Sequence, residues 1–541
     1  MKNAHFSFKK YRDKKSAIVG YASLLIYLIL MSLVYYYSIL AIFKSGNNWA
    51  VILYISFSLL TQTLFFYPGI LCLLITIISI FLGKKAFSFS TSIVSLKKFR
   101  DLSNAKIALL YTTKDDFIPD AAYTMLNQQT LDGKINKNCV AFILDDSTCS
   151  KFISIIDKFS KENGVKVIRR GNCGPRTKSG NLNFFFKKFL NNFDYYVILD
   201  SDTYIEKKWC SKTIQYFERF KDVGIVQGLN NAITNNTNNF QDFITPNDKE
   251  SKEFWGIDGE ISNLYSLTLC TGHACMWSKD LIAKNGGGIK NVISEDWTLS
   301  IDAKKLNYEC IYTSNCIAKE EVPPNYYAYK KRHLRWEGGA FQFFHNYFFK
   351  ILKSKFHFSQ KWLIFCQATS IFLITFNFFI STILTYLLMF VLDSNEIYIA
   401  FPYFVFVMNI FLFVLSALTL PCKAVVTKSS VIRVFITSYV STFVATSIMP
   451  SLLLEYFMLL CGKKIRFKVS IKHNKKITFK DFIKGSCFDI LVWSILCGFM
   501  LVACWYANAW LFLLTPWTII SFLSFASIFV LPFLSNIPLE K

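Results

Sequence analysis

Long uncharged apolar stretches lie near both ends of the chain. Residues 16–43 form one such run and residues 49–83 form a second. A transmembrane helix needs about 20 consecutive apolar residues, so each run predicts one membrane span. The basic N-terminus and the Lys84–Lys85 pair predict cytoplasmic outer ends, because cytoplasmic flanks are rich in Lys and Arg. The two spans therefore return the chain to the cytosol.

Four further spans are predicted in the last third of the chain. The uncharged runs 362–392 and 397–422 predict one span each, and the run 490–539 is long enough for two. The apolar piece 434–454 precedes a basic loop, 463–484. A spanning helix there would place the loop outside the cytosol, against the positive-inside rule. We therefore predict that this piece lies on the membrane surface, which leaves six spans.

Residues from about 86 to 350 have a different pattern, in which charged residues return. Short apolar runs alternate with polar segments typical of helices, and this alternation indicates an α/β domain with a mainly parallel sheet. A segment of this length is ample for one soluble domain. The four apolar runs are 107–111, 140–144, 195–199 and 224–227.

Composition and charge narrow the class of protein. Of the 541 residues, 53% are hydrophobic and only 18% are charged, whereas soluble domains carry about 25% charged residues. An ordinary soluble enzyme is therefore excluded. The net charge is +24, from 60 Lys and Arg against 36 Asp and Glu. In a soluble protein this charge would indicate nucleic acid, but lipid headgroups or a phosphorylated substrate fit it equally well. The motifs described below favour the headgroups and the phosphorylated substrate over nucleic acid.

Acidic residues follow two of the predicted strands. Asp145 follows the run 140–144, and Asp200 and Asp202 follow the run 195–199. The carboxyl ends of strands in open α/β sheets meet at the crevice where ligands bind. An Asp-x-Asp there offers hard oxygen ligands to Mg²⁺ or Mn²⁺, which bridge them to substrate phosphates. A single Asp-x-Asp is also common in surface turns, but two acidic strand ends favour a binding site.

Three further motifs combine charge with a helix end or an aromatic ring. Lys178 opens K-S-G-N-L-N, which is either a helix start that binds an anion or an ordinary helix cap. Glu295 and Asp296 fit a general base or the acidic first turn of a helix. Arg335 and Trp336 fit diphosphate and sugar recognition or the basic and aromatic belt at a membrane surface.

The motifs D-D-S, K-S-G-N-L-N, D-S-D, S-E-D and R-x-x-R-W occur in this order. In this order the chain resembles the membrane-embedded family-2 glycosyltransferases, and most closely the cellulose synthase type, from about residue 105 to the C-terminus. The resemblance implies a cytosolic GT-A-like α/β domain inserted in an α-helical membrane domain of about six spans plus interfacial helices. It implies three parts, 1–85, 86–335 and 336–541, and a bacterial inner membrane location with the catalytic domain in the cytoplasm.

The resemblance also implies a role for each matched residue. Asp145 would contact the nucleotide, and Asp200 and Asp202 would hold UDP and the Mg²⁺ or Mn²⁺ ion. Asp296, with Glu295 beside it, would be the general base. Lys178 and Arg335 would bind the nucleotide sugar. The acceptor side would comprise Trp336 and the loop residues Thr271, Gly272 and His273.

The basic loop and the R-x-x-R-W motif bear on processivity. Phe467, Ser470 and Lys472 resemble the F-x-V-T-x-K gating loop of the cellulose synthase type, with Ser for Thr, and would close over the nucleotide sugar; the loop is placed at 463–473. Arg332 stands where polymer-making members carry Gln. Some non-processive relatives have another residue there.

The resemblance implies an inverting enzyme that transfers sugar from a UDP-sugar to a growing polysaccharide and moves it through a membrane channel. The alternative within enzymes is a single transfer to a membrane lipid acceptor. A transporter with a regulatory cytosolic domain is a third interpretation. It has little support, because the apolar runs carry few ionisable residues. The expected partners are the UDP-sugar, a glycan or lipid-linked acceptor, and the lipid bilayer.

Overall fold

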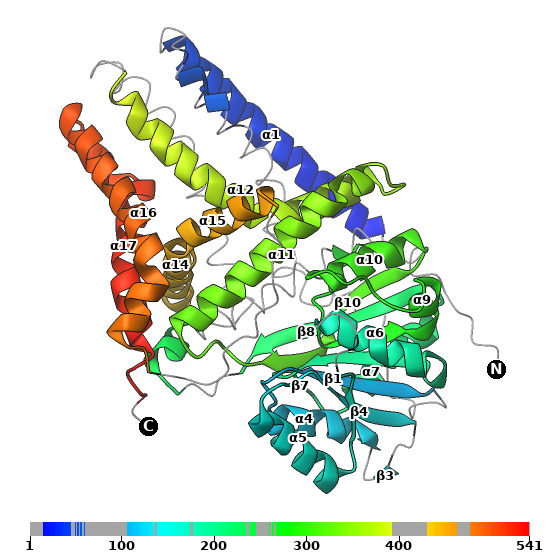
Figure 1. The fold of residues 1–541 in the computed structure, drawn as a ribbon. Helices are drawn as coiled ribbons and strands as arrows, with labels where there is room; N and C mark the ends of the chain where they lie inside the picture. The colour runs from blue at the N-terminus through cyan, green and yellow to red at the C-terminus, as the bar shows by residue number, and fades with distance from the viewer. Residues whose placement is uncertain are drawn as a thin grey trace.

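The computed structural model describes most of residues 14–59, and residues 105–391, 430–462 and 476–539. The described part contains an α/β domain and a set of long apolar helices beside it (Figure 1). Short gaps interrupt the first two ranges, at 45–48, 50, 54, 57–58, 132–133, 136–137, 172, 174–176, 234–236, 245–258, 260–261 and 264–266.

An eight-stranded sheet forms the centre of the α/β domain. Four of its strands match the predicted ones and extend them by one to six residues. In spatial order the strands are β5 (Lys166–Arg169), β4 (Cys139–Asp145), β1 (Ile107–Thr113), β6 (Tyr195–Asp200), β9 (Cys275–Ser278), β8 (Val223–Ala232), β10 (Glu309–Glu320) and β7 (Tyr204–Ile205). A separate hairpin pairs β2 (Thr130–Leu131) with β3 (Lys134–Ile135).

The sheet is mixed, whereas the sequence predicts a mainly parallel one. Strands β5, β4, β1 and β6 are parallel, as are β8 and β10. Strand β9 runs antiparallel to both β6 and β8, and β7 runs antiparallel to β10. The apolar pattern of a strand reports its burial and not the direction of its neighbours, so the sequence did not reveal these pairs.

Helices cover both faces of the sheet. One face packs against α4 (Pro119–Leu126), α5 (Ser150–Asn163) and α7 (Trp209–Arg219). The other packs against α6 (Lys178–Phe189), α9 (Lys279–Lys284) and α10 (Glu295–Lys305). Every residue of β1 is consequently buried. A strand that is covered on both faces has a continuous apolar sequence, as β1 does.

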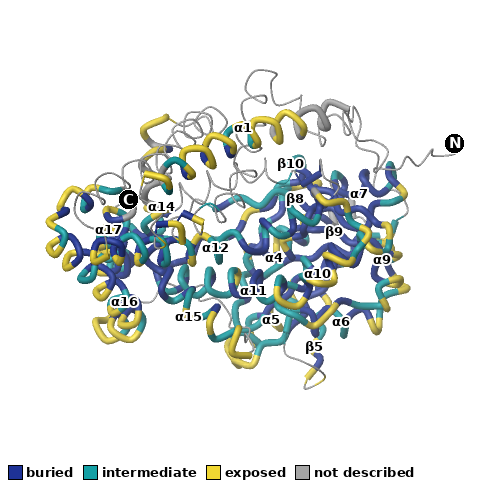
Figure 2. The backbone as a smooth tube through the Cα atoms, turned by 90° about the horizontal axis from the view of Figure 1, so that it is seen from above, coloured by how far each residue is buried: buried dark blue, intermediate teal, exposed yellow. Residues whose placement is uncertain are grey.

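Three helices in the described residues are long and apolar enough to cross a membrane: α1 (Lys14–Lys44), α12 (Phe358–Leu388) and α16 (Phe479–Tyr506). Figure 2 shows α1 largely exposed, as contact with lipid would require. Shorter apolar helices follow in the same part of the molecule. These are α14 (Val431–Ser447), α15 (Met449–Leu460) and α17 (Pro516–Leu534).

The described residues therefore show three of the six predicted spans. The predicted span at 397–422 lies outside the described residues, as does most of the one at 49–83. The run 490–539 does contain two apolar helices, since α16 ends at Tyr506 and α17 begins at Pro516. The piece 434–454 is divided between α14 and α15, and its surface location stays a prediction.

Helix α11 (Tyr326–Leu352) connects the α/β domain with the apolar helices (Figure 1). It begins after two prolines, at the N-cap Asn325, whose side chain accepts a hydrogen bond from the Ala328 amide at 2.9 Å. This contact satisfies one of the free amides at a helix start. The predicted domain boundary between residues 335 and 336 lies inside this continuous helix.

Candidate active site

The two acidic strand ends lie at the same edge of the sheet, with one strand between them. Strand β1 separates β4 from β6, and the register pairs Thr113 with Asp145 and Thr112 with Asp200. The Thr112 hydroxyl lies 3.3 Å from Asp200 Oδ1. The acidic residues thus end parallel strands at the edge where α/β sheets bind ligands.

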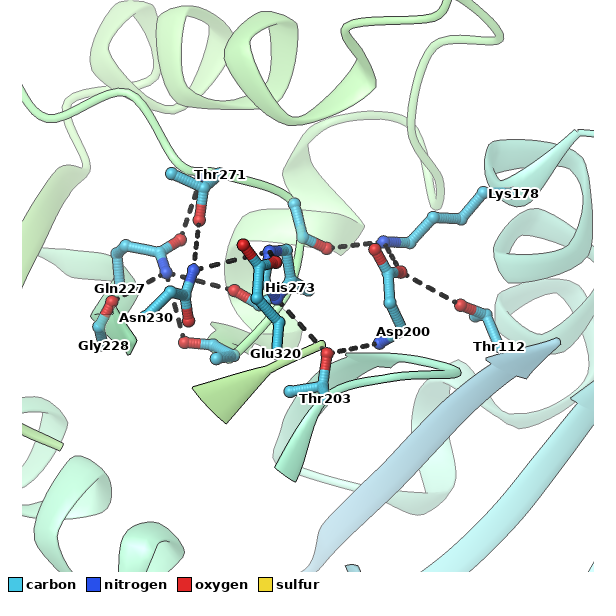
Figure 3. A network of polar contacts seen from close by, with 12 residues as sticks. Thr112, Lys178, Asp200, Thr203, Gln227, Gly228, Asn230, Thr271, His273 and Glu320 are labelled. Atoms are coloured by element: carbon cyan, nitrogen blue, oxygen red, sulfur yellow. Dashed lines mark hydrogen bonds and ion pairs between the residues drawn. The ribbon is translucent and has the colours of Figure 1, made fainter. Parts of the chain in front are cut away.

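Lys178 joins three segments at this edge (Figure 3). Its ammonium group forms an ion pair with Asp200 at the end of β6 and donates a hydrogen bond to Gly272 O at 2.7 Å. Lys178 is also the first residue of α6, whose N-cap Thr177 accepts a hydrogen bond from the Gly180 amide. The predicted helix start is therefore present, and it presents its lysine to the acidic edge.

Burial and nearby charges shift the pKa of Lys178 in opposite directions. Burial disfavours the ammonium form, but Asp200 and Glu295 outweigh it and raise the pKa of Lys178 above its usual value. Lys178 therefore remains a cation, only 16% exposed. A cation at the mouth of an α/β crevice is suited to hold the phosphates of a ligand.

The paired carboxyls of Glu295 and Asp296 begin α10 close to Lys178. Glu295 is buried, and the Trp297 amide donates a hydrogen bond to Asp296 Oδ1 at 2.8 Å. Burial raises the pKa of both carboxyls, and the charge of Lys178 opposes the rise in each case. A carboxylate with a raised pKa is a stronger base than a solvated one, as general-base catalysis requires.

Helix α11 brings Arg335 to the same site. Burial lowers the pKa of the Arg335 guanidinium, and the nearby charges of Asp200 and Asp202 oppose that shift. On the same helix, the Arg332 guanidinium lies over the Trp336 ring, 4.6 Å from its centroid. Trp336 is 44% exposed. The site thus has two cations, Lys178 and Arg335, that interact with its carboxylates.

The loop before β9 approaches the predicted base closely. Gly272 has φ +83°, and a Cβ atom placed there would lie 2.8 Å from Asp296 Oδ2. The preceding residue is fixed by its neighbours. The Thr271 amide donates to Gln227 Oε1 at 2.9 Å, and Asn230 Nδ2 donates to the Thr271 hydroxyl at 3.1 Å. At position 272 only glycine fits both the backbone conformation and the space beside Asp296.

His273 connects this loop to strand β10 and to the turn between β6 and β7 (Figure 3). Its Nδ1 lies 3.2 Å from the Thr203 hydroxyl, and its Nε2 lies 3.3 Å from Glu320 Oε2 on β10. The Thr203 hydroxyl also accepts a hydrogen bond from the Asp200 amide at 3.1 Å. The imidazole thus stabilises the turn that carries the Asp-x-Asp motif, through Thr203. The role of His273 in acceptor binding, expected from the resemblance, stays a prediction.

Sequence reasoning missed several members of this network. Thr203 directly follows the Asp-x-Asp motif, and Gln227 ends a predicted strand, so both carried a signal that could have found them. Asn230 and Glu320 carried none, because Asn230 lies beyond the apolar run 224–227 and the strand of Glu320, β10, was not predicted.

Asp145 is committed to protein contacts. Its side chain accepts a hydrogen bond from Arg169 Nε at 2.6 Å and another from the Ser147 amide at 2.8 Å. The side chain has no exposed area. It orders the end of β4, and its contact with the nucleotide stays a prediction.

The Asp200 and Asp202 side chains fit one edge of a divalent-metal site. Both present hard oxygen donors, and the Asp200 side chain is 38% exposed. Within the described ranges, no group of three His, Cys, Asp or Glu residues is placed to hold a metal alone. Mg²⁺ commonly takes one or two carboxylates and completes its shell with substrate phosphates and water, which this pair allows.

The predicted gating-loop residues Phe467, Ser470 and Lys472 lie outside the described residues, and their roles stay predictions.

Comparison with known proteins identifies the class. Residues 139–339 match the family described as "Glycosyltransferase like family 2", and this range contains every predicted site residue outside the gating loop. The chain therefore carries a family-2 glycosyltransferase domain, and the resemblance drawn from its motifs is confirmed.

The curated relatives are plant proteins. "Probable glucomannan 4-beta-mannosyltransferase 6" of Oryza sativa subsp. japonica is 24% identical over 222 residues, which cover 39% of this chain and 38% of the relative. "Glucomannan 4-beta-mannosyltransferase 9" of Arabidopsis thaliana is 24% identical over 221 residues, covering 39% and 40%. The match thus spans about two fifths of the length of these relatives.

Two solved structures are also similar. A mannosyltransferase, PcManGT from Pyrobaculum calidifontis in complex with GDP-Man and Mn²⁺, has 13% identity and a TM-score of 0.41, covering 68% of this chain and 97% of that chain. S. aureus TarS has 14% identity and a TM-score of 0.31, covering 49% and 42%.

Proposed function

We propose that this protein is an inverting hexosyltransferase that uses a UDP-sugar to elongate a polysaccharide at the cytoplasmic face of a membrane. The observation that carries the proposal is the convergence, within a family-2 domain, of the Asp-x-Asp pair, the Glu295–Asp296 pair and two cations. Long apolar helices beside the domain support membrane attachment and an exit path for the product.

The donor diphosphate would bind between the two cations. Lys178 and Arg335 offer an ammonium and a planar guanidinium, and the latter suits paired phosphate oxygens. Asp200 and Asp202 would hold Mg²⁺ or Mn²⁺, which supplies positive charge to the departing UDP when it is bound. These groups are preorganised by burial and ion pairing, so they favour the charge that develops on the leaving group.

Asp296 would act on the acceptor. Its carboxylate removes the proton from the acceptor hydroxyl, whose oxygen forms a bond to the anomeric carbon. The bond from that carbon to the diphosphate oxygen breaks on the opposite face, so the configuration inverts. The nearby Gly272 leaves room for the acceptor because it has no side chain.

We expect the transfer rate to fall with decreasing pH, at pH values above the ordinary range of an Asp side chain. Asp296 acts as a base only when it is deprotonated, and burial raises the pKa of its carboxyl above the usual 3.8. Below that pKa, kcat/KM should fall about tenfold per pH unit. The measurement is kcat/KM against pH, and an acid limb centred near the ordinary value would contradict the prediction.

A second candidate function is the transfer of one sugar to a membrane lipid. The position of Arg332 favours it, because its guanidinium lies over the Trp336 ring. A tryptophan face covered by a cation is less open to stacking with the sugar of a growing chain. The two functions predict different products from the same donor.

We expect Arg332→Gln to lengthen the product if Arg332 limits chain growth. The substitution removes the cation from the Trp336 ring, which leaves its face open to an acceptor sugar. The measurement is product size after incubation with labelled donor, with Arg332→Lys as the control that keeps the charge. Equal product lengths for wild type and Arg332→Gln would show that this stacking has no part in product length.

The proposed function is tested by a donor screen on the purified protein in a bilayer. UDP-sugars and GDP-mannose are supplied separately with a divalent ion, and the product is analysed for sugar, linkage and length. GDP-mannose is included because the curated relatives are named as mannosyltransferases. Transfer from a UDP-sugar supports the proposal, whereas transfer from GDP-mannose alone contradicts its donor.

A further inference from the structure

The start of helix α11 packs against α16, one of the three helices that are long and apolar enough to cross a membrane. The Tyr327 hydroxyl lies 3.0 Å from Ser486 Oγ on α16. A Cβ atom at Gly485 would lie 2.4 Å from the Tyr327 ring, so α16 needs a glycine where the two helices meet. The same helix α11 carries Arg335 to the candidate active site. Its placement is therefore set in part by contacts outside the α/β domain.

A buried ion pair forms the centre of this contact. Lys330 pairs with the carboxylate of Asp489 on α16 and donates a hydrogen bond to Gly485 O at 2.8 Å. Asp489 Oδ1 accepts hydrogen bonds from the amide and the hydroxyl of Ser451 on α15, at 3.0 and 2.7 Å. The Asp489 side chain is 1% exposed. One carboxylate thus joins α11, α15 and α16 away from water.

Stability alone does not account for such a pair. Taking two charges out of water is costly, and well-packed apolar side chains in place of a buried pair often leave stability unchanged or higher. Ionisable residues within membrane helices more often serve function. The contacts of Lys330 and Asp489 are directional, and they fix α11 both along its axis and around it.

We infer that Lys330 and Asp489 are positioning residues that keep Arg335 aligned with the Asp-x-Asp pair. The inference rests on the proposed function, because Arg335 is there assigned to the sugar diphosphate. Lys330 and Arg335 are five residues apart on one helix, or about 7.5 Å along its axis. A shift at Lys330 therefore reaches Arg335 and weakens its contact with the sugar diphosphate, and this loss of donor binding appears in KM.

The test compares Lys330→Met, Asp489→Asn and the double variant Lys330→Met/Asp489→Leu in a bilayer. Each is measured for KM, kcat and thermal midpoint with the donor that the screen identifies. We expect each single variant to raise KM about tenfold, equivalent to about 1.4 kcal/mol, and to lower the thermal midpoint. The double variant should regain its midpoint, because no unpaired charge remains, but keep the raised KM.

A double variant with the wild-type KM would overturn the inference, as would a single variant that folds and keeps its KM. If the single variants do not accumulate, the double variant decides. Lys484→Met serves as the matched control, because Lys484 is an exposed lysine on α16. UDP binding to the wild type is titrated separately. A wild type that neither binds UDP nor transfers sugar counts against the proposed donor, whereas normal binding with unchanged KM in the variants counts against the ion pair.

Discussion

Asp296→Asn is expected to lower sugar transfer about 10²–10⁴-fold, the usual contribution of a general base. Asparagine keeps the shape of the side chain and can still contact the Trp297 amide, but it cannot take a proton from the acceptor. The loss should appear in kcat, because the groups assigned to the diphosphate, Lys178 and Arg335, are unchanged. The measurement is steady-state transfer together with UDP affinity.

The control for this variant is Asp280→Asn. Asp280 is an exposed carboxylate on α9, outside the candidate site, so its replacement should leave both transfer and UDP affinity at wild-type values. An Asp296→Asn protein with normal kcat would show that another group removes the proton. A protein that loses UDP affinity and kcat together would instead show that Asp296 supports the donor site.

Gly272→Ala is expected to lower kcat about 100-fold by displacing the base. Gly272 has φ +83°, and its new Cβ would lie 2.8 Å from Asp296 Oδ2, closer than two such atoms can remain. Either the loop or the Asp296 side chain must move, and a catalytic group displaced by about 1 Å can lose about two orders of magnitude in rate. The measurement is kcat together with the thermal midpoint.

Gly286→Ala separates this steric effect from backbone strain. Gly286 has φ +85°, but an added Cβ meets nothing within 4 Å. Both variants therefore place an alanine in the left-handed backbone conformation, which costs about 1–2 kcal/mol. The thermal midpoint should fall in both. Only Gly272→Ala should also lower kcat. Equal kcat values in the two variants would contradict a steric link between Gly272 and Asp296.

The local sequence identified the acidic strand ends because their signals are short in range. The apolar runs before Asp145 and Asp200 are continuous, as β4 and β6 are covered on both faces, and the carboxylates follow each run directly. The signal for the start of α6 at Lys178 was equally local, because the N-cap Thr177 directly precedes it in the sequence. Such features depend on a few neighbouring residues, and their pattern is preserved in the chain.

The pairing of distant segments had no such signal. Strand β9 has only four residues and runs antiparallel between β6 and β8, a direction that its own residues do not encode. The contacts of His273 with Glu320 and of Lys330 with Asp489 join residues 47 and 159 positions apart. Isolated polar residues give no indication of which partner they meet.

The sequence by itself determined the membrane-associated α/β class, four strands, the family and the residues of the acidic edge. Hydrophobic patterning and motif order carry that information because each depends on local chain chemistry. Only the tertiary structure decided that Gly272 faces Asp296, that Lys178 bridges Asp200 and Gly272, and that Asp489 seats α11. Those contacts depend on how the elements pack, which single residues do not specify.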